Sequence, residues 1–239
     1  IVMAEIRSRQ GSEQGAVVRR LNMLGRDILR RKGFFPPVGE IDILDIRFNN
    51  LVAYQGISQI MDVECGPYGT YSILDNRRKK IFTYDIEGNL LYAYGGPDVS
   101  FGGFHTPVSL AQHENYMMVL DKNASLIAVY KQTEFGQQIE TAIKAQETGD
   151  YKKAGELWSD ISRFNANYEL AYTGMGIAEY RDGNYEDAMI LFKLGNNRDW
   201  YSRAYQEYRK TLIYKWFSPI AIVLAVFTGL FAIVKIILK

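Results

Sequence analysis

The last part of the chain, Phe217–Val234, is a run of 18 residues without a charged side chain, and Lys215 and Lys235 flank it. An α-helix rises about 1.5 Å per residue, so a helix extended to Leu238 can cross a hydrocarbon layer about 30 Å thick. Trp216 beside Lys215 is typical of the interface between lipid and water. The stretch 216–238 therefore predicts a transmembrane helix. The alternative is a buried core helix, which would need more surrounding protein than the end of the chain supplies.

Composition narrows the classes of partner. The 239 residues include 28 Lys and Arg against 27 Asp and Glu, a net charge of +1, which argues against a broad electrostatic surface for nucleic acid. Cys65 is the single cysteine, so an intrachain disulfide and a cysteine-based zinc site are excluded. The chain begins at Ile1 without a signal peptide, and we interpret it as a fragment or processed form of a longer protein.

An internal repeat lies between residues 60 and 135. Tyr71–Asp75 resembles Met117–Asp121, and Asp121 minus Asp75 gives an offset of 46 residues. The same offset carries Ile81 onto Ile127 and Tyr84 onto Tyr130 without a gap. In the first copy, residues 85–89 form a predicted hairpin turn with Gly88 at the position that needs a positive φ. Short strands repeated at a period in the forties are typical of β-propeller blades.

The stretch IFTYDIEGNLLYAYGG resembles the NHL-type propeller signature, and the resemblance covers about Leu51–Phe135. It implies an incomplete β-propeller over residues 1–136. Two copies cannot close a ring, so we expect the other blades in a missing N-terminal part. The motif says little about the ligand, because NHL-like propellers include protein scaffolds, RNA binders and lyases.

After Gly136 the apolar period changes to that of a helix, with Ile139, Ala142, Ile143 and Ala145 on one face. Two stretches, 149–158 and 183–192, then share the pattern Gly-x-Tyr-x-x-Ala-x-x-x-aromatic, and 183 minus 149 gives a period of 34 residues. This pattern resembles the tetratricopeptide repeat. The resemblance implies a helical-repeat module over 137–214, in which the two glycines end helices, small residues let helices approach closely, and Trp158 and Phe192 fill the gaps between repeats. Residues 200–214 predict a capping helix that leads into the membrane stretch.

The complete order is propeller blades, a helical-repeat module and a membrane helix. It resembles bacterial membrane proteins in which an NHL-type propeller and tetratricopeptide repeats precede a Yip-type membrane domain of several spans. The resemblance covers most of Gly15–Tyr214. The predicted fold class is therefore multidomain: incomplete all-β blades, an α-helical repeat module and a C-terminal transmembrane helix.

The sequence offers few candidates for chemistry. Asp75 and Asp121 occupy equivalent places and are the best candidates for a paired-carboxylate site, but an aspartate at the end of a strand more often caps the following turn, and we expect that structural role. His105 and His113 lack the further ligands of a zinc site. The basic run 76–80 is interpreted as a solvated turn. We predict no catalytic, metal-binding or cofactor-binding residue.

The remaining predicted surface is the concave side of the helical repeats, where such modules hold partner peptides. By register, Gln146, Glu147, Tyr180 and Arg181 face it, although they can equally be ordinary exposed helix residues. Other expected partners are membrane lipid through Phe217–Leu238 and components of a transport system, with no nucleic acid.

We expect a non-enzymatic membrane-anchored scaffold in which the propeller and helical repeats bind a protein or an envelope ligand. One alternative is a propeller-type lactonase or lyase whose active site lies in blades missing from this chain. Another is a repeat region that merely spaces the propeller from the bilayer. The basic residues before the span favour a cytoplasmic body by the positive-inside rule, whereas the family resemblance favours an extracytoplasmic body at the cell membrane, and we lean to the second.

Overall fold

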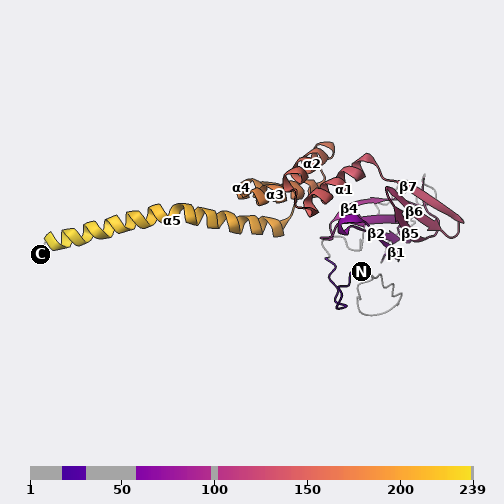
Figure 1. Ribbon diagram of the computed structural model, residues 1–239, viewed down its shortest axis with the longest axis horizontal. Helices are drawn as coiled ribbons and strands as arrows, with labels where there is room; N and C mark the ends of the chain where they lie inside the picture. The colour runs from indigo at the N-terminus through magenta and orange to yellow at the C-terminus, as the bar shows by residue number, and fades with distance from the viewer. Residues whose placement is uncertain (1–17, 31–57, 98–101, 238–239) are drawn as a thin grey trace, which may run out of the picture. The chain divides into compact units, whose positions relative to one another are not determined.

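The computed structural model describes residues 18–30, 58–97 and 102–237, and the predicted loops and strands at 1–17 and 31–57 lie outside these described residues. The chain divides into two compact units, Ile1–Glu147 and Thr148–Lys239 (Figure 1). Among the described residues, the first unit holds antiparallel sheets, a short 3-10 helix and one α-helix, and the second unit is helical. The predicted order of β-structure followed by α-helices is confirmed.

The first unit contains two antiparallel sheets. The first sheet has four strands in chain order and includes a short 3-10 helix between its first two strands, and the second sheet has three strands. These elements are β1 (Ile60–Cys65), η1 (Pro67–Gly69), β2 (Tyr71–Asp75), β3 (Lys80–Tyr84), β4 (Leu90–Tyr94), β5 (Pro107–His113), β6 (Tyr116–Asp121) and β7 (Leu126–Lys131). Helix α1 (Glu134–Glu147) follows β7 directly, and the predicted apolar face of this helix is buried.

The offset of 46 residues relates the two sheets in detail. Both inner hairpin turns contain a residue with a positive φ at the same repeat position, Lys79 at 54° and Ser125 at 52°. The predicted turn glycine, Gly88, has a φ of 84°. The repeat found in the sequence is therefore a repeat of the backbone fold.

The two faces of the first sheet have different neighbours. Its front face consists of Tyr71, Ile73, Phe82 and Tyr84 and packs on Val18 and Leu29. Its back face packs on the second sheet, in a cluster formed by Leu74, Ile81, Phe104, Leu110, Met117 and Val119. Because Met117 and Val119 are the repeat equivalents of Tyr71 and Ile73, the front face of the second sheet covers the back face of the first. The hairpin predicted near Gly25 is reduced to one antiparallel bridge, between Leu21 and Asp27.

The second unit is a stack of helices in which each helix contacts the next along the chain. Its helices are α2 (Tyr151–Phe164), α3 (Glu169–Asp182), α4 (Tyr185–Leu194) and α5 (Arg198–Ile237). Asp150 caps α2 by accepting a hydrogen bond from the Lys153 amide at 3.2 Å. Gly183 ends α3 with a φ of 85°, and its amide donates to carbonyls of the last turn, as predicted.

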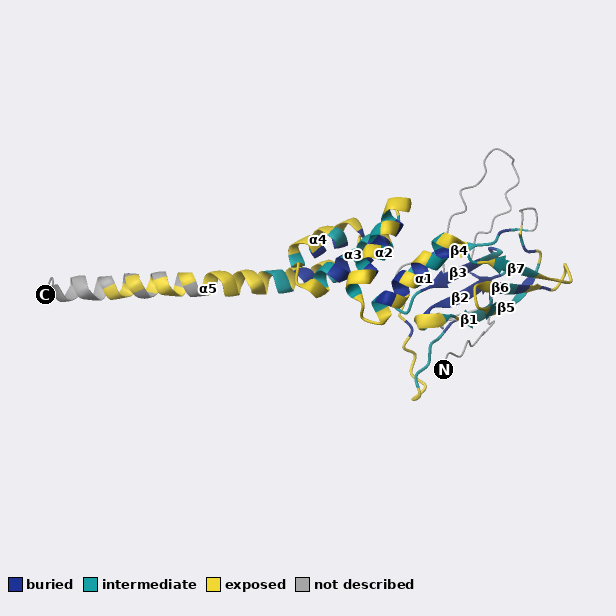
Figure 2. Ribbon diagram, turned by 45° about the horizontal axis from the view of Figure 1, so that its top comes forward, coloured by how far each residue is buried: buried dark blue, intermediate teal, exposed yellow. Residues whose placement is uncertain are grey.

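Large aromatic side chains and glycines set the spacing of this stack. A Cβ atom added to Gly174 would lie 2.3 Å from the Trp158 ring, and one added to Gly176 would lie 2.7 Å from the Phe192 ring. Trp158 and Phe192 are both buried. Figure 2 colours the buried residues of the helices dark blue. The predicted packing of aromatic residues against small residues is confirmed for α2, α3 and α4.

Helix α5 is one continuous helix that joins the predicted capping segment to the apolar stretch and contains Pro219. Ala204 is buried near its start. Farther along, the described large apolar side chains are exposed, and most side chains of Phe217–Val234 lie outside the described residues. Within the part of the chain that the structure describes, no helix is both long enough and apolar enough to span a membrane. The helical conformation is confirmed as far as Ile237, and the transmembrane role of 216–238 stays a prediction.

Candidate functional site

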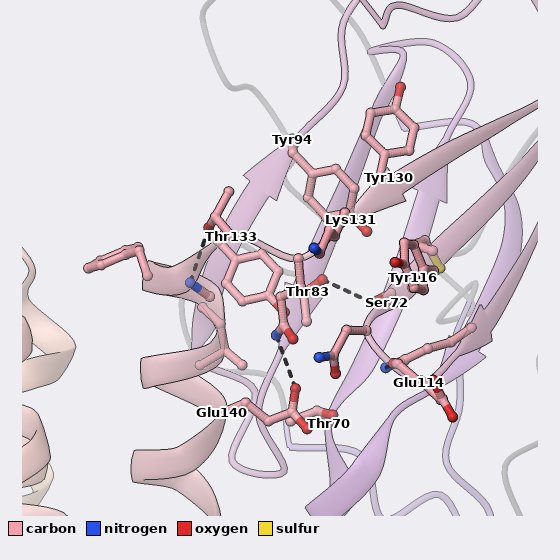
Figure 3. A pocket seen from close by; sticks show the side chains of 18 of the residues that line it. Thr70, Ser72, Thr83, Tyr94, Glu114, Tyr116, Tyr130, Lys131, Thr133 and Glu140 are labelled. Carbon is pink, nitrogen blue, oxygen red and sulfur yellow. Dashed lines mark hydrogen bonds between the residues drawn. The ribbon is translucent and has the colours of Figure 1, made fainter.

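The first unit contains a cavity of about 350 Å³ between the first sheet, the ends of β6 and β7, and the start of α1 (Figure 3). Hydroxyl, amide and aromatic side chains dominate its lining. The lining residues include Thr70, Ser72, Thr83, Tyr92, Tyr94, Tyr116, Tyr130, Gln132 and Glu140. A pocket of this volume is at the lower end of the range of small-molecule sites, which is about 300–1,000 Å³.

Two hydroxyl groups form the floor of this pocket. Ser72 on β2 and Thr83 on β3 face each other in the sheet register, and their hydroxyls share a hydrogen bond of 2.9 Å. Both side chains are buried, at 4% and 5% exposure. Their repeat equivalents in the second sheet are the apolar residues Met118 and Val129. The back face of the first sheet therefore carries a buried polar pair where the second sheet carries an apolar pair.

Tyrosines form the wall of the pocket. Tyr94 and Tyr130 meet edge to face with their ring centroids 5.4 Å apart, and Tyr92 lies 6.1 Å from Tyr94. Burial raises the pKa of Tyr130 to about 12, and burial with the neighbouring Tyr92 and Tyr130 raises the pKa of Tyr94 further above its ordinary value. These phenols stay neutral at physiological pH, so the wall offers ring surface and O–H groups without charge.

The side of the pocket next to α1 is held by hydrogen bonds around the β7–α1 connection. Gln132 Nε2 donates to Glu140 Oε2 at 3.0 Å, and the Gly136 amide donates to Thr133 Oγ1 at 3.2 Å. Burial raises the pKa of Tyr92, hydrogen bonds with Gln132 and Thr83 oppose this, and the Glu140 charge adds to it. The negative charge of Glu140 therefore acts on the Tyr92 hydroxyl across the pocket.

This lining is suited to binding by shape and hydrogen bonding. Most of its polar groups are neutral, Glu140 is already hydrogen-bonded, and the aromatic wall offers apolar contact. Within the described residues, no group of three His, Cys, Asp or Glu side chains is placed to hold a metal ion. The pocket can orient a ligand with mixed apolar and hydrogen-bonding surface.

The four residues predicted to bind a partner fall in both compact units. Gln146 and Glu147 end α1 in the first unit, where partial burial and then the Glu87 charge raise the pKa of Glu147. Tyr180 and Arg181 lie near the end of α3 in the second unit. None of the four lines the cavity described above.

Internal contacts occupy the predicted pair on α3. Tyr180 packs edge to face on Tyr185 and Trp200, with ring centroids 5.4 and 5.6 Å apart. The Arg181 guanidinium carbon lies 4.9 Å from the centroid of the Tyr151 ring. These contacts hold helices of the second unit together, and the predicted role in partner binding stays a prediction.

The two repeated aspartates have the structural role that was expected. Asp75 accepts hydrogen bonds from the amides of Gln59 at 3.2 Å and Arg77 at 2.8 Å. At the equivalent place, Asp121 accepts from the amide of His105 at 2.6 Å. Burial would raise the pKa of Asp121, but its backbone N–H donors outweigh burial and lower that pKa. Each carboxylate ties the segment before the first strand of its sheet to the inner hairpin turn.

The basic run 76–80 differs from its interpretation as a solvated turn. The Arg78 side chain is buried, and its guanidinium donates to Asp75 Oδ2 at 2.9 Å and to Ser58 Oγ at 2.7 Å. The repeat equivalent, Ala124, has no charge. Arg78 therefore forms a buried ion pair that is specific to the first sheet.

No model of a known protein family matches the chain, and no curated protein matches it. The pocket was missed in the sequence because Ser72 and Thr83 look like ordinary strand residues. The available signal was the alignment of the two copies, which places these hydroxyls opposite Met118 and Val129.

Proposed function

We propose that the chain is a membrane-anchored interaction protein whose β-sheet unit binds a ligand in the tyrosine-lined pocket. The observation that carries this proposal is the buried pair Ser72 and Thr83 at the pocket floor. Their mutual hydrogen bond offsets the cost of burying the two hydroxyls. The second sheet uses the apolar residues Met118 and Val129 at these positions, so pairing of the strands does not itself require hydroxyls. A polar pair beside an open cavity is what orienting a ligand requires.

The apolar stretch of α5 supports membrane anchoring. Trp216, Phe217, Ile222, Leu224 and Val226 are all more than half exposed. At 100° per residue these positions point to several sides of the helix, and a helix that is apolar all round is stable when protein or lipid surrounds it. Anchoring in a bilayer would remove these side chains from water.

The repeats support a role in interaction. The 46-residue sheet repeat and the 34-residue helical repeat are the basis for assigning propeller blades and a tetratricopeptide-type module to this chain. We infer that the helical module adds a second contact surface for a protein partner beside a transport or envelope system. In this proposal, the pocket holds the protein or envelope ligand outside the cytoplasm.

The binding role is tested by photo-crosslinking at the rim of the pocket. A photoreactive amino acid replaces Tyr116, which lines the pocket and is 40% exposed, in the full chain expressed in bacterial cells. The same experiment is repeated with Ser72→Met and Thr83→Val, which place the residues of the second sheet on the pocket floor. We expect a discrete adduct that the double substitution removes.

The matched control is the reciprocal exchange Met118→Ser and Val129→Thr on the second sheet, outside the floor of the pocket. This variant should retain the adduct. A failure to form any adduct, or an adduct of equal yield when the floor is filled, would contradict the binding role of the pocket. Circular dichroism of each variant checks that the sheets are intact.

A further inference from the structure

The second sheet has one strand fewer than the first. In the first copy of the repeat, the chain leaves β3, turns at residues 85–89 and returns as β4. In the second copy, the chain leaves β7 and enters α1 only three residues later, so no fourth strand follows. Among the described residues, β6 is the single strand that pairs with β7. The outer edge of β7 occupies the place where β3 pairs with β4.

The backbone of β7 directs hydrogen-bonding groups to this outer edge. The Gln132 amide donates to the Asn115 carbonyl at 2.8 Å, so Gln132 faces β6. Along an antiparallel strand the N–H and C=O groups of successive residues alternate between the two sides. Met117 pairs with Tyr130 in this register, so the backbone N–H and C=O groups of Ile127 and Val129 point away from β6. The first copy agrees with this assignment, because the amide of Asp85, two residues after Thr83, donates to the Asn89 carbonyl on the β4 side at 3.0 Å.

The side chains of this edge are apolar and exposed. Ile127 is 62% exposed and Val129 is 60% exposed, and Leu126 is about half exposed. A long apolar edge strand with unpaired backbone groups favours pairing with another strand, and native proteins usually protect such edges with charge, proline or cover. The described strand carries one charged residue, Lys131, at its end.

We propose that the edge of β7 accepts an extended segment of a protein partner by β-strand addition. The segment has the chemistry of β4, with about five residues in which leucine or other aliphatic residues and tyrosines alternate, and it runs antiparallel to β7. Continuity with the first sheet supports this choice, because Tyr94 and Tyr92 lie opposite Ile81 and Thr83 there. Main-chain hydrogen bonds would supply affinity, and the exposed Ile127 and Val129 side chains would select apolar neighbours. Ile127 and Val129 do not line the pocket, whereas Tyr130 and Lys131 at the end of the same strand do. The proposal is independent of membrane anchoring.

The test uses a fluorescein-labelled peptide with the sequence Gly88–Gly95 (GNLLYAYG) and the full chain in detergent. We expect saturable binding by fluorescence anisotropy. Val129→Pro removes the outward N–H without removing a bond to β6, and it should weaken binding at least about tenfold, because proline ends the ladder at that residue. The matched control Val129→Ala keeps the N–H and should change affinity by no more than about threefold, the loss of part of one cross-strand contact.

Hydrogen exchange of the wild-type chain provides a readout without a variant. The peptide should slow exchange of the Ile127 and Val129 amides and leave that of Ala128, which faces β6, unchanged. Absence of saturable binding would overturn the proposal, as would a peptide that protects neither outward amide. Equal losses in Val129→Pro and Val129→Ala would assign the contact to the side chain and also overturn strand addition.

Discussion

The buried ion pair between Asp75 and Arg78 gives a quantitative prediction. The second sheet provides a comparison, because it keeps the aspartate, as Asp121, but has Ala124 in place of the arginine. Asp75 is 0% exposed, and Arg78 donates to it at 2.9 Å. Two substitutions break the pair from opposite sides. Asp75→Asn leaves the buried guanidinium without its countercharge, and Arg78→Ala leaves the carboxylate with its backbone donors.

The structure predicts unequal costs for the two substitutions. Removing one partner of a buried pair costs about 3–5 kcal/mol when the remaining charge is uncompensated, which is the expected cost of Asp75→Asn. After Arg78→Ala, Asp75 still accepts hydrogen bonds from the backbone amides of Gln59 and of residues 77 and 78. The second sheet already has this arrangement, because Ala124 stands at the place of Arg78 and its amide donates to Asp121. Arg78→Ala removes the hydrogen bonds to Asp75 and Ser58 but leaves the carboxylate with its backbone donors, so we expect it to cost about 2 kcal/mol, less than Asp75→Asn.

Hydrogen exchange of the Ile73 and Leu74 amides measures these costs within the first unit. Tryptophan fluorescence does not report on this unit, because the three tryptophans of the chain lie at 158, 200 and 216. The double variant should cost less than the sum of the single variants, since both remove the same interaction. The reasoning is refuted if Arg78→Ala is at least as costly as Asp75→Asn, or if the costs simply add.

Further predictions concern the helical stack and one titrating carboxyl. Gly174→Ala should lower the stability of the second unit by about 1–3 kcal/mol by overpacking against Trp158, which thermal unfolding followed by tryptophan fluorescence measures. Gly183→Ala, with open space around it but a φ of 85°, should cost about 1 kcal/mol. A smaller cost for Gly174→Ala than for Gly183→Ala would contradict the packing account. Burial raises the pKa of Asp85 from 3.8 to about 6 against the opposing hydrogen bonds from Asn89. The folded chain then binds this proton more tightly than the unfolded chain, so the unfolding free energy should fall as pH rises from 4 to 6. Asp85→Asn should flatten that fall in urea titrations, and an unchanged slope would contradict the assignment.

Most of what could be predicted about the fold came from the two repeat periods, 46 residues in the sheets and 34 residues in the helices. The alternation around Ile73 and the recurrence of Asp75 at Asp121 predicted two related sheets, because strand alternation and turn capping are local effects. Gly183 and Trp158 predicted the helical stack for the same reason. The number of strands in the second sheet was not predictable in this way, since a missing fourth strand changes no local pattern.

The candidate site was harder to predict, because Ser72 and Glu140 are 68 positions apart in the sequence and neither belongs to a motif. Ser72 and Glu140 meet at one pocket only after two sheets and α1 have packed together. Arg78 was misjudged for a related reason: charge in a turn usually indicates solvent, and burial of its guanidinium depends on Asp75 and Ser58. Long-range packing decides both cases.

Membrane anchoring of the binding unit is tested most directly by flotation of the full chain with phospholipid vesicles, followed by extraction at alkaline pH. The comparison variant is Leu224→Glu with Val226→Glu, and the matched control is Ile190→Glu with Leu194→Glu, which places the same charges on exposed apolar residues of α4. The account predicts that the wild type and the control float and resist extraction, whereas the α5 variant stays with the soluble fraction. Wild-type chain that fails to float, or an α5 variant that floats equally well, would contradict anchoring through this helix.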